Sequence, residues 1–247
     1  KHPYTGLYTY CTEVAEAMAR VISEDDKLSF LVPRGDDRVF GDQFKYIKRD
    51  FKENEFPYIF VPGLDIWHST FQLTRYTGGS FGTKKVLTIH DLNCLHEDIA
   101  LRDRKKLLEI TQKNFDRADH IITISEFVKR DIENNLNIRN KPISVVYNGY
   151  KIREYSDFDN PAYRPRNPFI FTMGMVNEKK NFMVLPALLR NNEYELVIAG
   201  KLIEKVELEY KERIETQALK YGVQDRIRFL GSIPEEDKYW YMKNCAA

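Results

Sequence analysis

Short apolar runs alternate with longer amphipathic stretches along this chain of 247 residues. The short runs are rich in β-branched and aromatic residues and predict strands at residues 28–32, 66–68, 86–89, 121–124, 143–147, 169–173, 195–199 and 227–230. The amphipathic stretches predict helices at residues 10–22, 102–115, 126–135, 182–190, 205–221 and 235–244. This alternation is typical of βαβ units, and the predicted fold class is therefore α/β with parallel sheets.

Prolines and polar residues mark a domain boundary and the starts of two helices. The stretch from Ser156 to Pro168 contains three prolines, is polar and has no periodicity, so it is predicted to be an exposed linker between a domain of residues 1–155 and a domain of residues 169–247. Ser125 has the residue type of a helix N-cap. Pro234 suits the start of the last helix, where a missing N–H group is harmless.

Composition narrows the class of protein. The apolar share of 43% is ample for a core, and the net charge of +1 argues against a bulk nucleic-acid binder. Cys11, Cys94 and Cys245 are scattered, which fits neither a disulfide framework nor a zinc site and indicates a reducing compartment. The lysine-rich residues 44–56 could lie on an anionic membrane surface or simply be a solvated face.

The first candidate for chemistry is the pair His90 and Asp91, which follows the predicted strand at residues 86–89. Ligands of open α/β sheets bind beyond the carboxyl ends of the strands. A histidine there can hydrogen-bond a hydroxyl and exchange its proton near neutral pH, and the carboxylate can orient the ring or bind sugar hydroxyls. A structural histidine followed by a helix-capping aspartate fits the same two residues, so both interpretations stay open.

The second candidate follows the predicted strand at residues 169–173. Gly174 allows a ligand to approach the backbone closely, and Lys179 and Lys180 come just before a predicted helix whose free N–H groups favour an anion. Together they could hold a diphosphate, although a lysine-rich turn is common. A base-type pair after one sheet and a phosphate-type pair after another predict a cleft between two domains.

Two further features concern the start of the first helix and the spacing of the remaining histidines. The residues from Gly6 through Tyr10, which include Tyr8, open the first helix and could form a ligand-facing loop, although neither G-x-G-x-x-G nor G-K-[ST] is present. The remaining histidines show no H-E-x-x-H or similar spacing, and we therefore predict no bound metal.

A series of phrases, in order and spacing, resembles the retaining, nucleotide-sugar-dependent glycosyltransferases of family 4, which have the GT-B fold. One of these phrases is Val86-Leu-Thr-Ile-His90-Asp91-Leu. The others are residues 4–14, 64–71, 121–131, 145–149, 169–181, 196–201 and 228–233. The resemblance spans nearly the whole chain.

The resemblance implies two Rossmann-like domains that face each other across a cleft, with the acceptor side in residues 1–155 and an incomplete donor domain in residues 169–247. The loop with Gly6 and Tyr8 would face the cleft. His90 would lie beside the donor sugar and the acceptor, with Asp91 supporting the site.

The resemblance also implies a donor site in the second domain. Lys180 would match the family lysine that neutralises the donor diphosphate. Lys179 stands where many members carry arginine and would be a weaker, non-bidentate partner. Gly200 and Lys201 would contact the donor, and Ile233 would lie near the nucleotide base through backbone contacts.

Some family features are replaced or missing. Tyr8 stands in place of the second glycine of the opening loop, and Thr9 in place of its arginine. The family's two glutamates, eight positions apart in a Pro/Gly-rich context, are absent; Glu204 and Glu212 have that separation but belong to a highly charged helix. We therefore expect the sequence to be a fragment, truncated at both ends.

The implied activity is transfer of a hexose from a UDP- or GDP-type sugar to a hydroxyl acceptor, with retention at the anomeric carbon and without a cofactor. The implied setting is the synthesis of cell-surface polysaccharide or lipid-linked oligosaccharide by a cytoplasmic enzyme, with peripheral contact to the inner face of the membrane. Alternatives are a nucleotide-sugar epimerase or sugar phosphorylase of the same fold, and a non-catalytic GT-B-like binding module.

Overall fold

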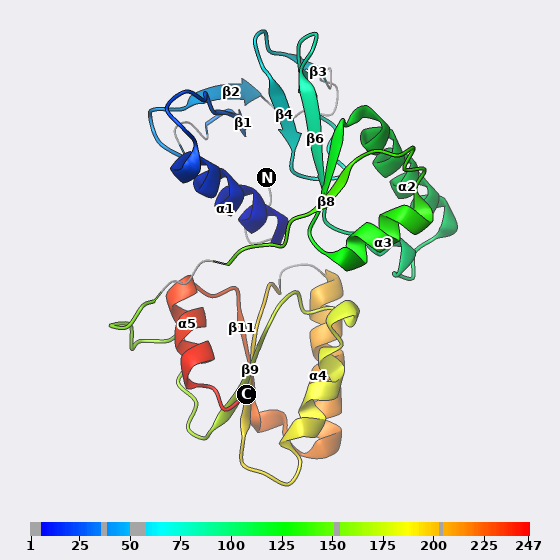
Figure 1. Cartoon of the computed structure of the whole chain (residues 1–247). Helices are drawn as coiled ribbons and strands as arrows, with labels where there is room; N and C mark the ends of the chain where they lie inside the picture. Colours follow the sequence, from blue (N-terminus) through cyan, green and yellow to red (C-terminus); the bar gives the residue numbers. More distant parts are fainter. Residues whose placement is uncertain (1–5, 36–38, 50–57, 151–153, 203–204) are drawn as a thin grey trace. The chain divides into compact units, whose positions relative to one another are not determined.

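Figure 1 shows the computed structural model of the chain, which describes residues 6–35, 39–49, 58–150, 154–202 and 205–247. Its contacts divide the chain into two compact units, residues 1–150 and residues 151–247, each with its own hydrophobic core. Every strand pair among the described residues is parallel, which confirms the predicted α/β class.

The first unit builds its strands into separate parallel sheets. β1 (Ser29–Pro33) pairs with β2 (Lys45–Arg49), and β3 (Tyr58–Phe60) pairs with β5 (Thr77–Gly79). The largest sheet has the order β4-β6-β7-β8 and consists of β4 (Ile66–Ser69), β6 (Lys84–Ile89), β7 (His120–Thr123) and β8 (Ile143–Val145).

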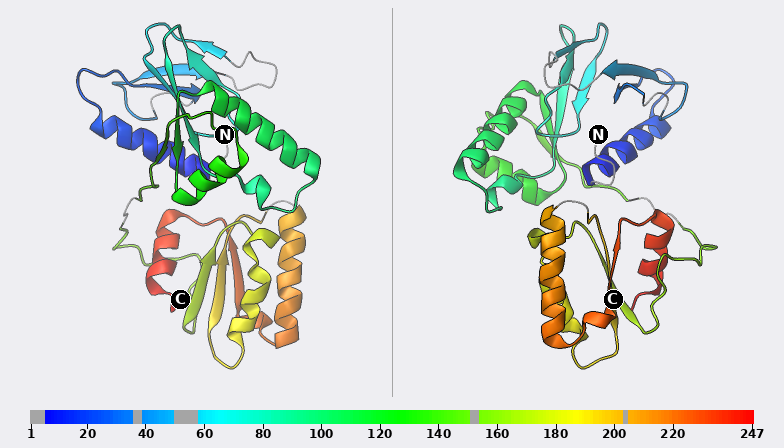
Figure 2. Two further views of the ribbon diagram at one scale, coloured as in Figure 1. Left: turned by 45° about the vertical axis from the view of Figure 1, so that its right-hand side comes forward. Right: turned by 180° about the vertical axis from the view of Figure 1, so that it is seen from behind.

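Helices cover the largest sheet of the first unit. α1 (Gly6–Val21) lies on one side of it, and α2 (Leu101–Arg117) and α3 (Glu126–Asn135) lie on the other (Figure 2). The apolar residues of β6, β7, α2 and α3 that face inward make a single core, in which Ile89, Phe115, Ile121 and Ile132 are fully buried. The Ser125 hydroxyl accepts the Val128 N–H at 3.2 Å, which confirms the predicted N-cap of α3.

The second unit is one three-stranded sheet covered on both faces. Its strands are β9 (Phe169–Met173), β10 (Glu195–Ala199) and β11 (Ile227–Gly231), in the order β11-β10-β9. α4 (Lys205–Tyr221) and the 3-10 helix η3 (Phe182–Leu189) cover one face, and α5 (Glu235–Asn244) covers the other. The short 3-10 turns η2 (Glu178–Lys180) and η4 (Gln224–Arg226) connect these elements, as η1 (Asn93–Leu95) does in the first unit.

The structure corrects three expectations about local structure. The predicted helix at residues 182–190 is a 3-10 helix, because Pro186 within it cannot donate to an α-helical ladder. The loop expected at Gly6 and Tyr8 is the first turn of α1, where the Thr12 hydroxyl donates back to the Tyr8 carbonyl at 3.1 Å. Strands β2, β3 and β5 were not expected. Residues 45–49 of the lysine-rich stretch form β2, and residues 50–56 lie outside the described residues.

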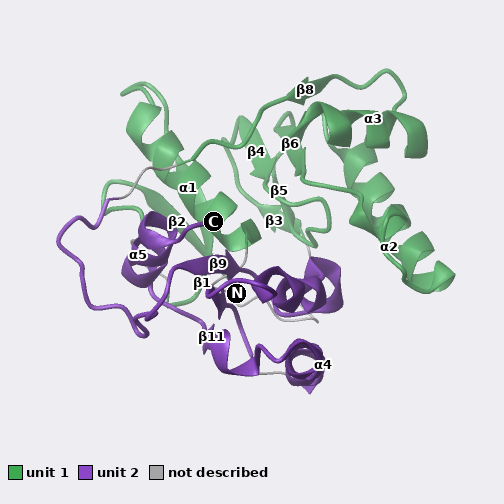
Figure 3. Ribbon diagram, turned by 90° about the horizontal axis from the view of Figure 1, so that it is seen from below, with its two compact units in different colours: residues 1–150 green, residues 151–247 purple. Residues whose placement is uncertain are grey.

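The stretch predicted to be a linker, residues 156–168, belongs with the second unit (Figure 3). Phe158 and Tyr163 pack against the core cluster around Trp240. The Tyr163 N–H donates to the Tyr241 hydroxyl at 2.9 Å, and the Ala162 N–H donates to the Asp237 carboxylate at 2.8 Å. None of the helices in the described ranges combines the length and apolar character that a membrane span requires.

Candidate functional site

His90 follows the carboxyl end of β6, as the sequence predicts, and its half-buried ring is held on two sides. Its Nε2 lies 2.8 Å from the Thr70 carbonyl oxygen. The Tyr10 ring of α1 meets it edge-on, with centroids 4.4 Å apart, and the Phe71 ring lies at 6.5 Å. Because β4 pairs with β6 in parallel, with Ser69 opposite Leu87, the residues that follow β4 reach the imidazole. The site therefore draws on α1, β4 and β6.

Gln72 is a site residue that sequence reasoning missed. Its side chain, in a residue only 4% exposed, accepts the His90 N–H at 3.2 Å and donates to the Asp91 carbonyl at 3.0 Å. Asn114 of α2 donates to the Gln72 and Thr74 carbonyl oxygens, both at 2.8 Å. One signal was present in the sequence, since Gln72 stands shortly after a predicted strand, at the end where α/β sheets bind ligands.

The Asp91 carboxylate is engaged by the protein itself. Its Oδ1 accepts the Asn93 N–H at 3.1 Å at the start of η1, and it lies 3.4 Å from the Gln72 side-chain nitrogen. These are the contacts of a turn-capping aspartate, the structural interpretation that the sequence left open. Asp91 shapes the turn after His90 through these contacts of its Oδ1.

The neighbouring His68 is a structural residue. Its Nε2 lies 2.8 Å from the buried hydroxyl of Thr88, and burial lowers the pKa of His68 below its ordinary 6.5. The Tyr10 hydroxyl lies 3.4 Å from the same Thr88 oxygen. Among the described residues, no group of three or more His, Cys, Asp or Glu side chains is placed to hold a metal ion.

In the second unit, three glycines meet at the carboxyl ends of the strands. Gly174 follows β9, Gly200 follows β10 and Gly231 ends β11. The Gly174 N–H donates to the Ala199 carbonyl at 2.9 Å, and the Gly200 N–H donates to the Gly231 carbonyl at 2.8 Å. A Cβ atom on Gly200 would overlap the Gly174 carbonyl oxygen, so only glycine fits there. The result is a sheet edge at which three neighbouring strands each end at or are followed by a residue without a side chain.

Lys180 places a positive charge beside Gly174 at this glycine-lined edge. Its Cε and Cδ lie 3.6 and 3.9 Å from the position that a Cβ on Gly174 would take, so the lysine stem runs along the Gly174 backbone. Lys179 and Lys201 are exposed, Lys179 beside Lys180 and Lys201 directly after Gly200. Glu178 of the same turn is already paired with Arg213 of α4, which leaves it neutralised. The edge therefore suits an anion.

Two predicted features of this edge differ from expectation or stay untested. The Met183 N–H at the start of η3 donates to the Tyr210 hydroxyl at 3.3 Å, so this N–H group, which was expected to face an anion, is already used. The Ile233 side chain packs against the core around Trp240, and the predicted contact of its backbone with a base remains a prediction. In the first unit, the predicted site residue Tyr8 lies on the first turn of α1 and is 44% exposed.

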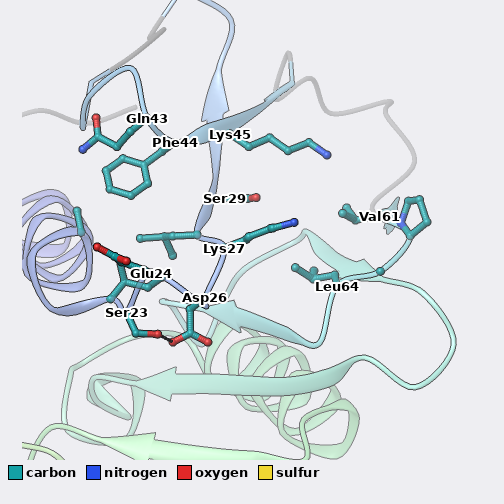
Figure 4. Close-up of a pocket in the computed structure, with 15 residues that line it drawn as sticks. Ser23, Glu24, Asp26, Lys27, Ser29, Gln43, Phe44, Lys45, Val61 and Leu64 are labelled. Atoms are coloured by element: carbon teal, nitrogen blue, oxygen red, sulfur yellow. Dashed lines mark hydrogen bonds between the residues drawn. The ribbon is translucent and has the colours of Figure 1, made fainter.

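A cavity of about 760 Å³ opens elsewhere in the first unit (Figure 4). It is lined by the end of α1, the start of β1 and the segment before β4, including Lys27, Ser29 and Leu64. These are the amino ends of the strands, and none of the predicted site residues lines it. Because ligands of open α/β sheets bind at the carboxyl ends, we do not assign this cavity to the chemistry of His90.

Comparison with known proteins decides the family. Residues 5–154 match the family model described as Glycosyltransferase Family 4. This chain belongs to glycosyltransferase family 4. Residues 156–247 match a second model, described as Glycosyl transferases group 1, so the two matches correspond closely to the two compact units. No curated protein matches the chain at a significant level.

Solved structures show that this chain of family 4 has the GT-B fold. Sucrose-phosphate synthase from Thermosynechococcus elongatus is 16% identical, with a TM-score of 0.56 over 74% of this chain and 49% of that protein. HepE from Anabaena, in complex with UDP-glucose, is 17% identical, with a TM-score of 0.53 over 73% and 51%. The lipopolysaccharide outer core galactosyltransferase WaaB is 16% identical, with a TM-score of 0.50 over 99% and 70%. The match spans about half the length of the first two proteins.

Proposed function

We propose that this protein is a retaining glycosyltransferase that moves a hexose from a UDP- or GDP-type sugar to a hydroxyl acceptor. The observation that carries the proposal is the position of Lys180, whose stem lies along Gly174 at a glycine-lined sheet edge. A pyrophosphate needs close approach to the backbone and a nearby positive charge, and this edge offers both. The family match and the structure of HepE with UDP-glucose agree with a donor of this kind.

The proposed reaction exchanges one bond at the anomeric carbon. The bond from that carbon to the β-phosphate oxygen breaks, and a bond to the acceptor oxygen forms on the same face of the sugar. The acceptor's proton passes to the departing phosphate oxygen. The Lys180 ammonium stabilises the charge that develops on the leaving group.

His90 has a separate role in the proposal. Its imidazole positions sugar hydroxyls or the acceptor, and Asp91 contributes by shaping the turn behind it. Gly6 and Tyr8 would contribute to the acceptor side from the first turn of α1. Lys179 and Lys201 would add charge around the donor, with weaker geometry than an arginine fork provides.

Calorimetry with UDP and GDP on the full chain tests the donor site. We expect Lys180→Ala to weaken nucleotide binding by about tenfold or more, which corresponds to roughly 1.4 kcal/mol. Lys220→Ala, at an exposed lysine in the last turn of α4, is the matched control and should bind like the parent. Equal affinity in all three proteins would remove Lys180 from the donor site.

A turnover assay separates the proposed activity from its alternatives. Transfer to an acceptor, lost in His90→Ala with little change in nucleotide affinity, supports the proposal. Conversion of the nucleotide sugar without an acceptor would favour an epimerase, and sugar release by phosphate would favour a phosphorylase. A non-catalytic module with only a structural role would bind neither UDP nor GDP.

We further propose that the acceptor is a growing cell-surface polysaccharide or a lipid-linked saccharide, and that the protein works in the cytoplasm at the inner face of the membrane. Two hydrogen-bonded turns of the first unit support peripheral contact. Phe60 ends β3 and is 71% exposed, and Phe81 lies in the turn before β6 and is fully exposed. The Val61 N–H donates to the Gly79 carbonyl at 3.0 Å and the Lys84 N–H donates to the Asp65 carbonyl at 2.8 Å, which joins the segments after β3 and β5. We call the exposed residues Phe60 and Phe81 the apolar tip.

A further inference from the structure

We propose that Thr70 and Gln72 hold His90 in one orientation and one tautomer, with the proton on Nε2, so that Nδ1 can only accept a hydrogen bond. In that state a substrate hydroxyl must donate to His90. The identity of the hydroxyl rests on the proposed function, whereas the tautomer rests on the geometry of the first unit alone.

The contact with Thr70 fixes the position of the proton. The His90 Nε2 lies 2.8 Å from the Thr70 carbonyl oxygen, and a carbonyl oxygen can only accept. Nε2 must therefore carry hydrogen, and a neutral imidazole then has a bare Nδ1. No residue in the described ranges hydrogen-bonds Nδ1, whose lone pair is thus available to a ligand.

Gln72 fixes the backbone on both sides of the histidine side chain. Its Oε1 accepts the His90 N–H, and its Nε2 donates to the Asp91 carbonyl. The two partners settle which end of the amide is oxygen, because an N–H needs an acceptor and a carbonyl needs a donor. Asn114 of α2 donates to the Gln72 carbonyl at 2.8 Å. We call the two side-chain hydrogen bonds of Gln72 the Gln72 brace, and Asn114 attaches it to α2.

Tyr10 restricts rotation of the imidazole. Its ring lies at 90° to the His90 ring with centroids 4.4 Å apart, and its hydroxyl lies 3.4 Å from the Thr88 oxygen. A flipped imidazole would replace the N–H donor at Thr70 with a carbon, and the half-buried Thr70 carbonyl would lose its partner. A lost hydrogen bond of this kind costs about 1–3 kcal/mol, which is enough to keep one orientation dominant.

Two residues that touch no substrate therefore act as positioning residues for the reaction. Gln72 aligns the His90 and Asp91 backbone, and Thr70 selects the tautomer. A misplacement of about 1 Å at a reacting centre can lower turnover roughly a hundredfold. We expect loss of the Gln72 brace to lower kcat by about tenfold to a hundredfold and to change the donor KM by less than about threefold, because the donor pyrophosphate binds elsewhere.

Nitrogen-15 NMR of the histidine side chains in the full chain tests the tautomer directly. His90→Gln identifies the signals of residue 90. The expected result for the parent is a protonated Nε2 and an unprotonated Nδ1. In Gln72→Met, mixed or averaged nitrogen signals are expected, whereas the matched Gln217→Met change in α4 should leave the signals as they are. A protonated Nδ1 in the parent would overturn the assigned tautomer, and unchanged signals in Gln72→Met would overturn the role of Gln72 in holding the imidazole against Thr70.

Kinetics provide the second measurement. Gln72→Glu keeps an acceptor for the His90 N–H but cannot donate to the Asp91 carbonyl, and it serves if Gln72→Met does not fold. A fall in kcat at constant donor KM supports the positioning role, and a fall that follows only the folded fraction contradicts it. If the parent transfers no sugar, the proposed function fails while the NMR result on the tautomer still stands.

Discussion

Gly200 lies so close to Gly174 that a side chain on Gly200 would overlap the Gly174 carbonyl oxygen. The contact brings together the backbones that leave β10 and β9, and the Gly200 N–H is held by the Gly231 carbonyl at 2.8 Å. The absence of a side chain on Gly200 is what allows these two backbones to pack closely beside Lys180. Stability and nucleotide binding should therefore depend on the same glycine.

We predict that Gly200→Ala lowers the free energy of unfolding by about 3 kcal/mol or more, because backbone atoms must move to admit the methyl group. Gly222→Ala is the control for backbone strain without steric overlap, since Gly222 has a positive φ (67°), unlike Gly200, and open space around its Cβ position. That variant should lose only about 1–2 kcal/mol of backbone strain. Urea unfolding followed by the fluorescence of the buried Trp240 measures both, and equal losses would contradict steric overlap as the cause.

The buried carboxylate of Glu195 attaches residues 156–168 to the second unit. It is only 4% exposed and accepts the Tyr163 hydroxyl together with the Arg166 and Asn167 N–H groups, the last two at 2.7 and 3.0 Å. We predict that Glu195→Gln lowers the free energy of unfolding by about 2 kcal/mol, because an amide cannot accept from all three donors. Glu215→Gln, at an exposed ion pair on α4, should cost less than about 1 kcal/mol.

The same carboxylate predicts a pH dependence. Burial alone would raise the pKa of Glu195, but the hydrogen bonds from Tyr163, Asn167 and Arg166 hold that pKa below its ordinary 4.5. Because the folded state binds the proton less readily than the unfolded state, Glu195 stabilises the fold above about pH 4.5 and loses this effect as the pH falls through the folded pKa. The free-energy difference between the parent and Glu195→Gln should shrink with acidification. A constant difference would contradict the linkage.

The sequence predicted most of the fold because its buried strands carry their own signal. β10 is buried at every position and is a continuous apolar run after Glu195, so its bounds match the prediction. β2, with the sequence Lys45-Tyr-Ile-Lys-Arg49, carries three basic residues in five and resembles a solvated face. β5 contains two glycines, which give no strand signal. Short or charged strands depend on their partners, and pairing partners cannot be read from a local pattern.

The candidate site divides in the same way. His90 and Lys180 were predictable, because each follows an apolar strand within a few residues. Gln72 also follows a predicted strand, but its contacts and those of Thr70 with His90 could not be predicted, because they depend on the register of β4 against β6, about twenty positions away in the sequence. The prolines of residues 156–168 correctly predicted irregular backbone. The attachment of this stretch to the second unit could not be predicted, because the partners of Tyr163 come from β10 and α5.

His68 provides another prediction on pH. Burial lowers the pKa of His68 below 6.5, so the unfolded state binds this proton more readily than the folded state. Its contribution to stability is complete above about pH 6.5 and is lost as the pH falls toward the folded pKa, by at most about 1.4 kcal/mol per pH unit. We predict that His68→Gln unfolds with a shallower pH dependence below pH 6.5. Between about pH 8 and 9, where His68 does not titrate, the slopes should coincide; identical slopes at all pH values would refute the assignment.

The apolar tip of the first unit should bind lipid bilayers, because Phe60 and Phe81 stand exposed on turns that hydrogen bonds hold together. Contact should be mainly apolar, since Lys84 beside them lies 3.7 Å from the Asp119 carboxylate and its charge is partly neutralised.

We predict that replacing both phenylalanines by serine lowers the partition coefficient onto vesicles by at least about tenfold, or 1.4 kcal/mol. Leu101→Ser, at an apolar residue 77% exposed at the start of α2, is the control and should bind like the parent. Sedimentation with phosphatidylglycerol and phosphatidylcholine vesicles measures the partition coefficient. Added salt should change this coefficient little, because ion pairs between the protein and anionic lipids contribute little to the contact. Binding that high salt abolishes, or that survives the double substitution, would show that lysines rather than this tip make the contact.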